Sequence, residues 1–222
     1  MKKMKKTISL TLAASIIICG GYMFFEPELA KSDTADTAIS LTVTGEINLN
    51  CSSTAALSPN IPGQSGGTAT GTFGCVVETS NSTGYNMTIE KDQKLQIADV
   101  ADQRFDDYTT SSASADYDWG AVGGGNEEFG FAVNSCASTT DIVATYKDNG
   151  ADTCGGAGTQ VNAWQCWTDI PTTTAVAVAN RATATPSGGI LTTFGLEAQA
   201  GASNNLNSGS YTCTTTVTAV TN

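Results

Sequence analysis

Cysteines, acidic pairs and tryptophans are the side chains of this chain whose types and spacing could support chemistry. The 222 residues include no histidine. Ser-His-Asp and Cys-His arrangements are therefore excluded, because both use imidazole as the proton carrier near neutral pH. A serine–lysine pair is also unsupported, since the stretch closest to SxxK spacing, Thr88 to Lys91, has a threonine where the nucleophilic serine belongs.

Paired carboxylates could still hydrolyse glycosides, a reaction that needs only two Asp or Glu side chains in different environments. Three pairs are available: Asp106 with Asp107, Asp116 with Asp118, and Glu127 with Glu128. Neighbouring acids are more often solvated loop residues, and on a strand adjacent side chains point to opposite faces. We therefore predict that the protein is not an enzyme and binds no cofactor.

Asp116, Asp118 and Gly120 form a D-x-D-x-G pattern, which is typical of the start of a calcium-binding loop because oxygen ligands two residues apart can converge on one ion. The remaining ligands and the distal Glu do not follow at EF-hand spacing. The alternatives are an irregular calcium site and an ordinary acidic turn, and the turn is the preferred interpretation. No other metal site is predicted.

Trp164 and Trp167 flank Cys166 and lie close in sequence to Cys154. Aromatic side chains exposed beside a stapled loop could stack on sugar rings or accept a partner's side chain, and Tyr117 is a third candidate for such contacts. The competing interpretation, which we prefer, is that Trp164 or Trp167 covers the disulfide as a small satellite core.

The cysteines indicate disulfides formed outside the cytoplasm. Six remain after the N-terminal segment: Cys51, Cys75, Cys136, Cys154, Cys166 and Cys213. An even number in an exported chain is typical of a disulfide framework, whereas zinc is disfavoured because no pair has CxxC spacing and histidine is absent. Cys154 and Cys166 are expected to pair, since only eleven residues of a Gly-rich stretch separate them.

The N-terminus predicts export. Residues 1–25 begin with a lysine-rich head and continue into an uncharged apolar run from Ile8 to Cys19, which is the pattern of a signal peptide. Cleavage fits best before Tyr22, and the alternative is an uncleaved anchor. Residues 26–38 are interpreted as a tether and residues 39–222 as a single β-sandwich domain, secreted or displayed at the cell surface.

The composition is acidic, with 21 acidic and 10 basic residues and a formal net charge of −11. Cleavage before Tyr22 removes four of the basic residues and leaves a net charge of −15. Nucleic acids and anionic membranes are poor partners for such a surface, because binding to both depends on Lys and Arg contacts. Membrane contact is expected only through the N-terminal segment, if that segment stays uncleaved.

Two-residue periodicity predicts an all-β, antiparallel fold. In the clearest strand, Leu41–Leu49, apolar and polar residues alternate. Further predicted strands are Phe73–Val77, Tyr85–Ile89, Phe129–Val133, Val176–Val178, Phe194–Ala198 and Tyr211–Val220. The first two of these are expected to form a hairpin around a turn at 81–84, and prolines and glycines predict a loop at 58–71.

The remaining segments are predicted to be mostly loops. Residues 93–128 are rich in Asp, Ser and Gly and are expected to form a long acidic excursion from the sandwich. Residues 141–147 could form about two helical turns before Gly150. About 180 residues after the leader and tether suit one β-sandwich better than two independent domains.

The closing stretch SGSYTCTTTVTAV, with Gly209, Tyr211 and Val217, and an early cysteine followed by another one strand later resemble small secreted pilin-like and spore-coat-like β-sandwich proteins. The stretches SPNIPGQSGGTATG and NSTGYNMTI are also similar to secreted bacterial proteins of comparable length. The resemblance implies a pairing of Cys51 with Cys75, structural or adhesive work outside the cell and, in some relatives, strand exchange between subunits. Cys136 with Cys213 is then the preferred completion among the fifteen pairings that six cysteines allow.

We therefore expect a non-enzymatic extracellular or cell-surface structural protein, such as a filament or coat subunit that contacts copies of itself. The alternative is a module that binds a surface glycan or protein through the loops around Trp164, Trp167 and Tyr117. Leu41–Leu49 could pair within its own sheet, which we prefer, or be donated to the exposed sheet edge of a neighbouring subunit.

Overall fold

The computed structural model describes residues 38, 40–98, 100, 102–111, 114–156 and 158–222. The predicted signal peptide or anchor, and the tether except for its last residue, lie outside the described residues. Contacts divide the chain into two units, Met1–Thr42 and Val43–Asn222. All of the strands belong to the second unit. Among the described residues, no helix has the length and apolar character needed to cross a membrane.

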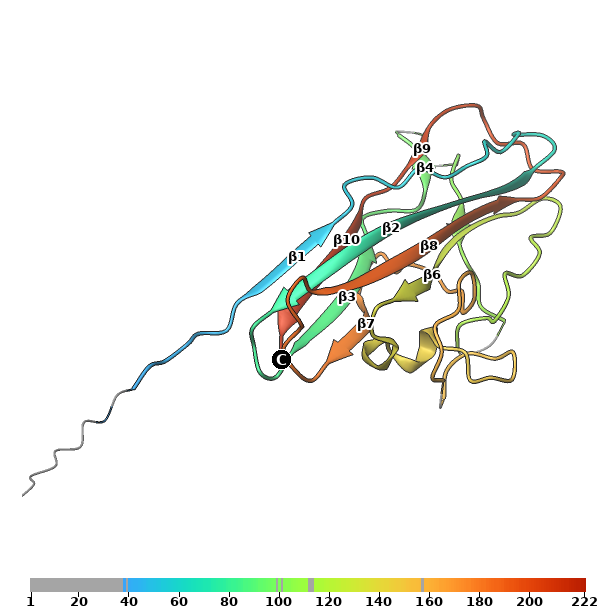
Figure 1. Cartoon of the computed structure of the whole chain (residues 1–222). Helices are drawn as coiled ribbons and strands as arrows, with labels where there is room; N and C mark the ends of the chain where they lie inside the picture. The colour runs from blue at the N-terminus through green and yellow to red at the C-terminus, as the bar shows by residue number, and fades with distance from the viewer. Residues whose placement is uncertain (1–37, 39, 99, 101, 112–113, 157) are drawn as a thin grey trace, which may run out of the picture. The chain divides into compact units, whose positions relative to one another are not determined.

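The largest sheet has five strands in the order β1-β2-β8-β6-β5 (Figure 1). They are β1 (Ile47–Cys51), β2 (Gly67–Thr79), β8 (Ile190–Ala200), β6 (Glu127–Cys136) and β5 (Asp106–Asp107). Neighbouring strands are antiparallel except for the short parallel contact of β5 with β6. The sheet curls into a half-barrel rather than forming one of two distinct flat layers.

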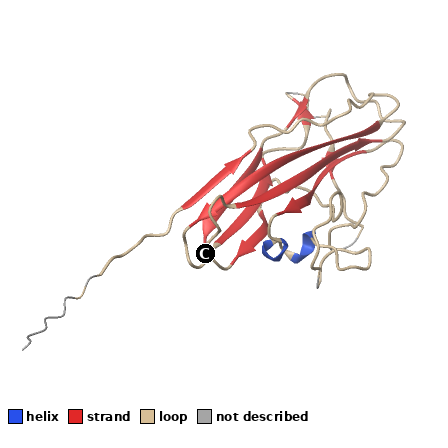
Figure 2. Cartoon of the chain, viewed as in Figure 1, coloured by secondary structure: helices blue, strands red, loops and turns tan. Residues whose placement is uncertain are grey.

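A three-stranded antiparallel sheet packs against the inner face of the half-barrel, and two short strands form a third sheet. The strands of the former are β10 (Thr215–Thr221), β3 (Tyr85–Lys91) and β7 (Val176–Arg181), and those of the latter are β4 (Gln96–Ile97) and β9 (Tyr211–Thr212). Strands dominate Figure 2, and the predicted helical turns appear as two single 3-10 turns, η1 (Thr139–Asp141) and η2 (Ala144–Tyr146). The all-β, antiparallel fold is confirmed.

The core lies between the five-stranded and the three-stranded sheet. Because side chains of a strand alternate between faces, every second residue of the long strands points into it. Phe73 of β2 and Phe194 of β8 are partners in register, and their rings stack with centroids 4.8 Å apart. The inward residues of β3 are fully buried: Tyr85, Met87 and Ile89.

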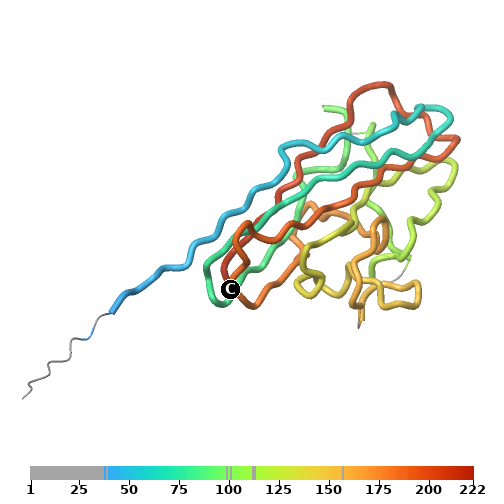
Figure 3. Tube along the Cα trace, in the orientation of Figure 1, coloured from blue at the N-terminus to red at the C-terminus, as the bar shows by residue number. Residues whose placement is uncertain are grey.

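The predicted hairpin of Phe73–Val77 with Tyr85–Ile89 is wrong. The turn at 81–84 exists, but β2 pairs with β1 and β8, whereas β3 pairs with β10 and β7, so the turn connects two sheets. In Figure 3 the C-terminus lies beside this turn, where Thr83 Oγ1 donates a hydrogen bond to the carbonyl of Asn222. Both edges of each strand are therefore already paired with other strands, which leaves no edge for a hairpin.

Three further expectations need correction at their boundaries. The first strand begins at Ile47, not at Leu41, and residues 40–46 pair with none of the strands that the structure describes. The predicted loop at 58–71 ends earlier, because residues from Gly67 onward already pair with β8. The closing strand is split between β9 and β10, and Cys213 and Thr214 lie between them outside any strand.

Residues 93–128, predicted to be a long loop outside the sandwich, partly belong to the sheets and the core. They contribute β4 and β5, and the side chains of Phe105 and Tyr108 are buried. The buried ammonium of Lys91 donates a hydrogen bond to the Asp107 carboxylate at 2.7 Å, so this acid pairs with a buried cation instead of serving as a solvated loop residue.

Candidate functional site

Two of the three expected disulfides form. Cys154 pairs with Cys166, and Cys51 pairs with Cys75, its partner in register across β1 and β2. The expected pairing of Cys136 with Cys213 is wrong, and both are free thiols. Cys136 ends β6, whereas Cys213 lies between β9 and β10, so the two cysteines belong to different parts of the fold. Burial raises the pKa of the Cys213 thiol to about 11.

The outer face of the five-stranded sheet carries a row of aromatic rings, which we call the aromatic face. It consists of Tyr108, Trp119, Trp167 and Trp164. The ring centroids of Tyr108 and Trp119 are 4.3 Å apart, those of Trp119 and Trp167 5.0 Å, and those of Trp167 and Trp164 5.9 Å. Loops that are distant in sequence therefore meet in one continuous aromatic layer.

Small residues of β6 and β8 make room for these rings. A Cβ atom added to Gly195 would lie 3.2 Å from Trp164, and one added to Gly130 would lie 2.7 Å from Tyr108 and 3.2 Å from Trp119. Ala132, the register partner of Gly195, is completely buried beneath the layer. Glycine inside a strand often marks such a close approach, and this is the sequence signal that could have located the aromatic face.

Trp164 and Trp167 have different roles. Trp167 is 1% exposed, as the satellite-core interpretation expects, whereas Trp164 is 38% exposed. The Trp164 backbone has a φ of +64°, which L residues rarely adopt, and its amide donates a hydrogen bond to Asn134 Oδ1 at 2.8 Å. Its carbonyl accepts a hydrogen bond from Trp167 Nε1 at 3.0 Å, and Cys166 is two residues away in the disulfide. The exposed ring is thus firmly positioned.

The residues at 116–118 support this face. Asp116 exchanges two backbone hydrogen bonds with Trp167, and its carboxylate accepts hydrogen bonds from Tyr108 Oη at 3.0 Å and Ser111 Oγ at 2.7 Å. Asp118 is exposed, and the described residues contain no group of three metal-ligating side chains. Tyr117 is half-buried outside the aromatic row, and its backbone carbonyl accepts a hydrogen bond from Cys166.

A polar strip runs beside the aromatic layer, mainly along the outward residues of β8. Glu197 is the register partner of Gly130 on one side and of Thr70 on the other. Burial raises the pKa of Glu197 to about 7. Gln199 holds the next ring in place, because its Oε1 accepts a hydrogen bond from Trp119 Nε1 at 3.1 Å. Glu197 and Gln199 were not among the residues singled out from the sequence.

The acidic pair at 127–128 is divided between two environments. Asn204 donates a hydrogen bond to the Glu127 carboxylate, whereas Glu128 lies on the outer face opposite Gln199. Burial raises the pKa of both carboxyls, and for Glu128 the charges of Asp106 and Asp116 raise it further. As expected for adjacent strand residues, the two carboxyls do not converge on one site.

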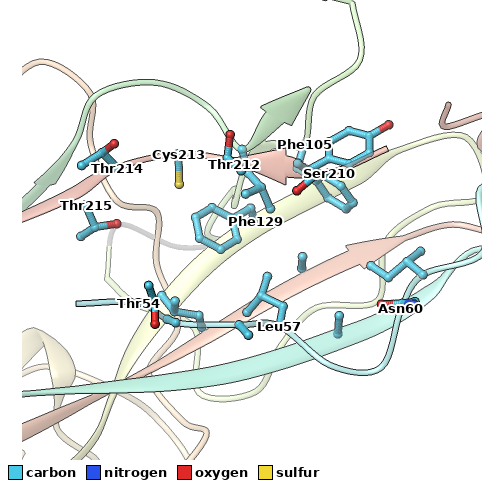
Figure 4. A pocket seen from close by; sticks show the side chains of 18 of the residues that line it. Thr54, Leu57, Asn60, Phe105, Phe129, Ser210, Thr212, Cys213, Thr214 and Thr215 are labelled. Atoms are coloured by element: carbon cyan, nitrogen blue, oxygen red, sulfur yellow. The ribbon is translucent and has the colours of Figure 1, made fainter. Parts of the chain in front are cut away.

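The inner face of the same sheet is less completely packed. A cavity of about 1360 Å³, which we call the inner cavity, lies between two chain segments: residues 51–64, which follow β1, and residues 206–217, which lead into β10. Its floor consists of inward side chains of the sheet, including Phe73, Phe129, Leu196 and Ala198. Figure 4 shows Leu57, Phe129 and the Cys213 thiol facing the same space. No sequence pattern indicates this cavity, because it results from how two loops are spaced.

Comparison with known proteins gives no match: no protein family, curated protein or solved structure is significantly similar to this chain.

Proposed function

We propose that this protein is a non-enzymatic, exported structural protein of the cell surface with a sandwich-like β domain, and that it serves as a subunit of a filament or coat. The observation that carries the proposal is an apolar segment, residues 40–45, that pairs with none of the described strands. Leu41 is 87% exposed and Val43 is 80% exposed, although both belong to the alternating pattern of a half-buried strand. Side chains of this kind are normally covered, and a second copy of the chain can cover them.

The reason for this exposure is the length of β2. The last β2 residue that pairs with β1 is Thr79, and the amide of Ser80 donates a final hydrogen bond to the Glu46 carbonyl at 3.1 Å. The chain then turns toward β3, and none of the described strands pairs with residues 43–45. Among the described residues, none forms a backbone hydrogen bond with residues 40–45, and the apolar side chains of this segment alternate. These are the two features of a strand that can be added to another sheet.

The inner cavity is the acceptor that we propose for this segment in a neighbouring subunit. Its walls include Leu49 and the residues that follow β1, whereas the segment precedes β1 in the chain. Partly buried apolar side chains line those walls: Leu57, Ile61, Leu206, Tyr211 and Val217. A donated strand would direct Leu41 and Val43 into this space and Thr42 and Thr44 away from it. Because donor and acceptor are different parts of the protein, repeated donation generates a head-to-tail chain.

Other features support a place outside the cell. Two disulfides are consistent with an extracellular location, and the leader-like N-terminus and acidic composition fit an exported, soluble subunit. The resemblance to pilin-like and spore-coat-like proteins implies the same kind of work.

Sedimentation velocity over a range of concentrations, with electron microscopy of the same samples, tests the proposal. The mature chain should form oligomers that grow with concentration. The double variant Leu41→Glu/Val43→Glu should sediment as a folded monomer, because charged side chains cannot enter an apolar space. Thr42→Glu/Thr44→Glu, the matched control with the same added charge on the other face of the strand, should still assemble. A mature chain that stays monomeric at every concentration contradicts the proposal.

A further inference from the structure

Trp164 is the most exposed of the three tryptophans. The other two tryptophans of the chain are more enclosed, and their indole N–H groups are used internally, by Gln199 for Trp119 and by the Trp164 carbonyl for Trp167. No described residue accepts a hydrogen bond from the Trp164 indole. Backbone conformations as rare as that of Trp164 persist only where the surroundings impose them, and they occur most often at functional sites.

The polar groups next to Trp164 are also available. Gly195 lies directly under its ring, and Glu197 is the next outward residue of β8, about 6.6 Å further along the strand. No described residue forms a hydrogen bond or ion pair with the Glu197 carboxylate, and burial alone accounts for its raised pKa. Hydroxyl groups of the same face lie on β2 beside these positions: Thr70 is the register partner of Glu197, and Thr72 is the register partner of Gly195.

An exposed indole beside a carboxyl group and several hydroxyls fits the chemistry of a sugar ring. A pyranose presents a face of C–H groups, which stack on an aromatic ring, and a rim of hydroxyls, which both donate and accept hydrogen bonds. We propose that the aromatic face binds a neutral saccharide chain, with one pyranose stacked on Trp164 and its hydroxyls bonded to Glu197 and the neighbouring threonines.

Charge restricts the class of saccharide. Glu128 and Asp116 lie near the same face, and the chain as a whole carries a net charge of −11. Sulfated and uronic acid polymers would be repelled by these carboxylates, so an uncharged chain is the ligand that fits. The aromatic face and the inner cavity lie on opposite faces of the five-stranded sheet, so saccharide binding at this face is independent of the proposed assembly.

Nitrogen–proton NMR spectra of the mature chain, titrated separately with cellohexaose, chitohexaose and mannohexaose, test this site. The three tryptophans give three indole N–H signals, and the signal of Trp164 should shift most with at least one of these probes. Trp164→Ala should weaken that binding about tenfold, equivalent to about 1.4 kcal/mol. The indole signals of Trp119 and Trp167 report in the same spectra whether the fold is retained.

Leu191→Ala is the matched control, because Leu191 is an apolar residue of β8 on the same outer face and is 45% exposed, but it lies outside the aromatic row. Its affinity for the probe should equal that of the unaltered chain, whereas Glu197→Gln should weaken binding severalfold. The proposal is overturned if none of the three saccharides moves the Trp164 signal, if Trp164→Ala binds as tightly as the unaltered chain, or if a sulfated glycan such as heparin binds equally well.

Discussion

The two faces of the five-stranded sheet differ in how completely side chains cover them. The outer face is covered by a layer of rings whose positions are fixed by hydrogen bonds, a disulfide and glycines in the strands beneath. The inner face is closely packed around Phe73 and Phe194 but opens toward one end into a cavity between two loops. A preorganised surface is suited to binding a ligand without rearrangement, whereas an incompletely filled cavity is suited to accepting a segment of another chain.

The largest effect is expected at the ring that lies in the middle of the aromatic layer. Trp167→Ala should lower the free energy of unfolding by about 3–5 kcal/mol, because it removes a fully buried side chain and leaves a cavity. Leu41→Ala should change it by less than about 0.5 kcal/mol, because Leu41 is exposed in the monomer. Urea denaturation measures both values. A similar loss of stability for the two variants would mean that Leu41 is as buried in the monomer as Trp167.

The second largest effect is expected for the disulfide that holds the Trp164 loop. Replacing Cys154 and Cys166 together by alanine should lower the free energy of unfolding by about 3 kcal/mol, since the cross-link restricts the unfolded chain. The free thiols supply the control: Cys136→Ser with Cys213→Ser removes two cysteines but no cross-link and should cost much less. Melting temperatures of the two double variants distinguish these outcomes, and equal losses would mean that the disulfide adds nothing.

Two buried alanines compare the packing of the two faces directly. Ala132 lies under the aromatic layer, and Ala198 lines the inner cavity. Ala132→Leu should destabilise the domain by about 1–3 kcal/mol through overpacking. Ala198→Leu should cost less than about 1 kcal/mol, since the added carbons extend into existing space. Urea denaturation of the two variants measures the difference, and a larger cost at Ala198 would show that the cavity is closed in solution.

The smallest effect is a pH dependence from Glu197. Its folded pKa of about 7 lies above the ordinary value of 4.5, so the folded state holds the proton more tightly than the unfolded chain. Its contribution is complete below pH 4.5 and is lost as the pH rises to about 7. Discounted for half exposure, this loss is about 1 kcal/mol. Glu197→Gln should remove it, so the stability of that variant should fall less between pH 4.5 and 8. If the stability of the two proteins changed equally with pH, the raised pKa would not belong to Glu197.

The strands could be predicted from the sequence because alternation is a local property. Phe129–Val133 and Phe194–Ala198 both fall within observed strands. Partnership between strands is not local, and for this reason β2 and β3 appeared to be a hairpin although each is paired with other strands on both edges. The end of β1 depends on where β2 stops, which no pattern within Leu41–Leu49 reveals.

The candidate site was predicted only in part. The sequence identified Trp164, Trp167 and their disulfide, but it could not say which ring is exposed, because that depends on contacts with β6 and β8. Glu197 was missed since a single acid in a strand carries no motif. The free thiols show a further limit: an even number of cysteines does not establish that all of them pair.

The most direct test of whether residues 40–45 enter the inner cavity of a neighbouring subunit uses the native thiol of Cys213 as a reporter. This thiol faces the cavity (Figure 4). Leu41→Cys and Val43→Cys would each be made in a Cys136→Ser background, oxidised mildly at an assembling concentration and separated on a non-reducing gel, with Thr44→Cys as the control. Entry of the segment into the cavity should give a ladder of disulfide-linked multimers for Leu41→Cys or Val43→Cys, and the ladder should disappear with Cys213→Ser. Cross-linking no greater than that of Thr44→Cys would contradict entry of the segment.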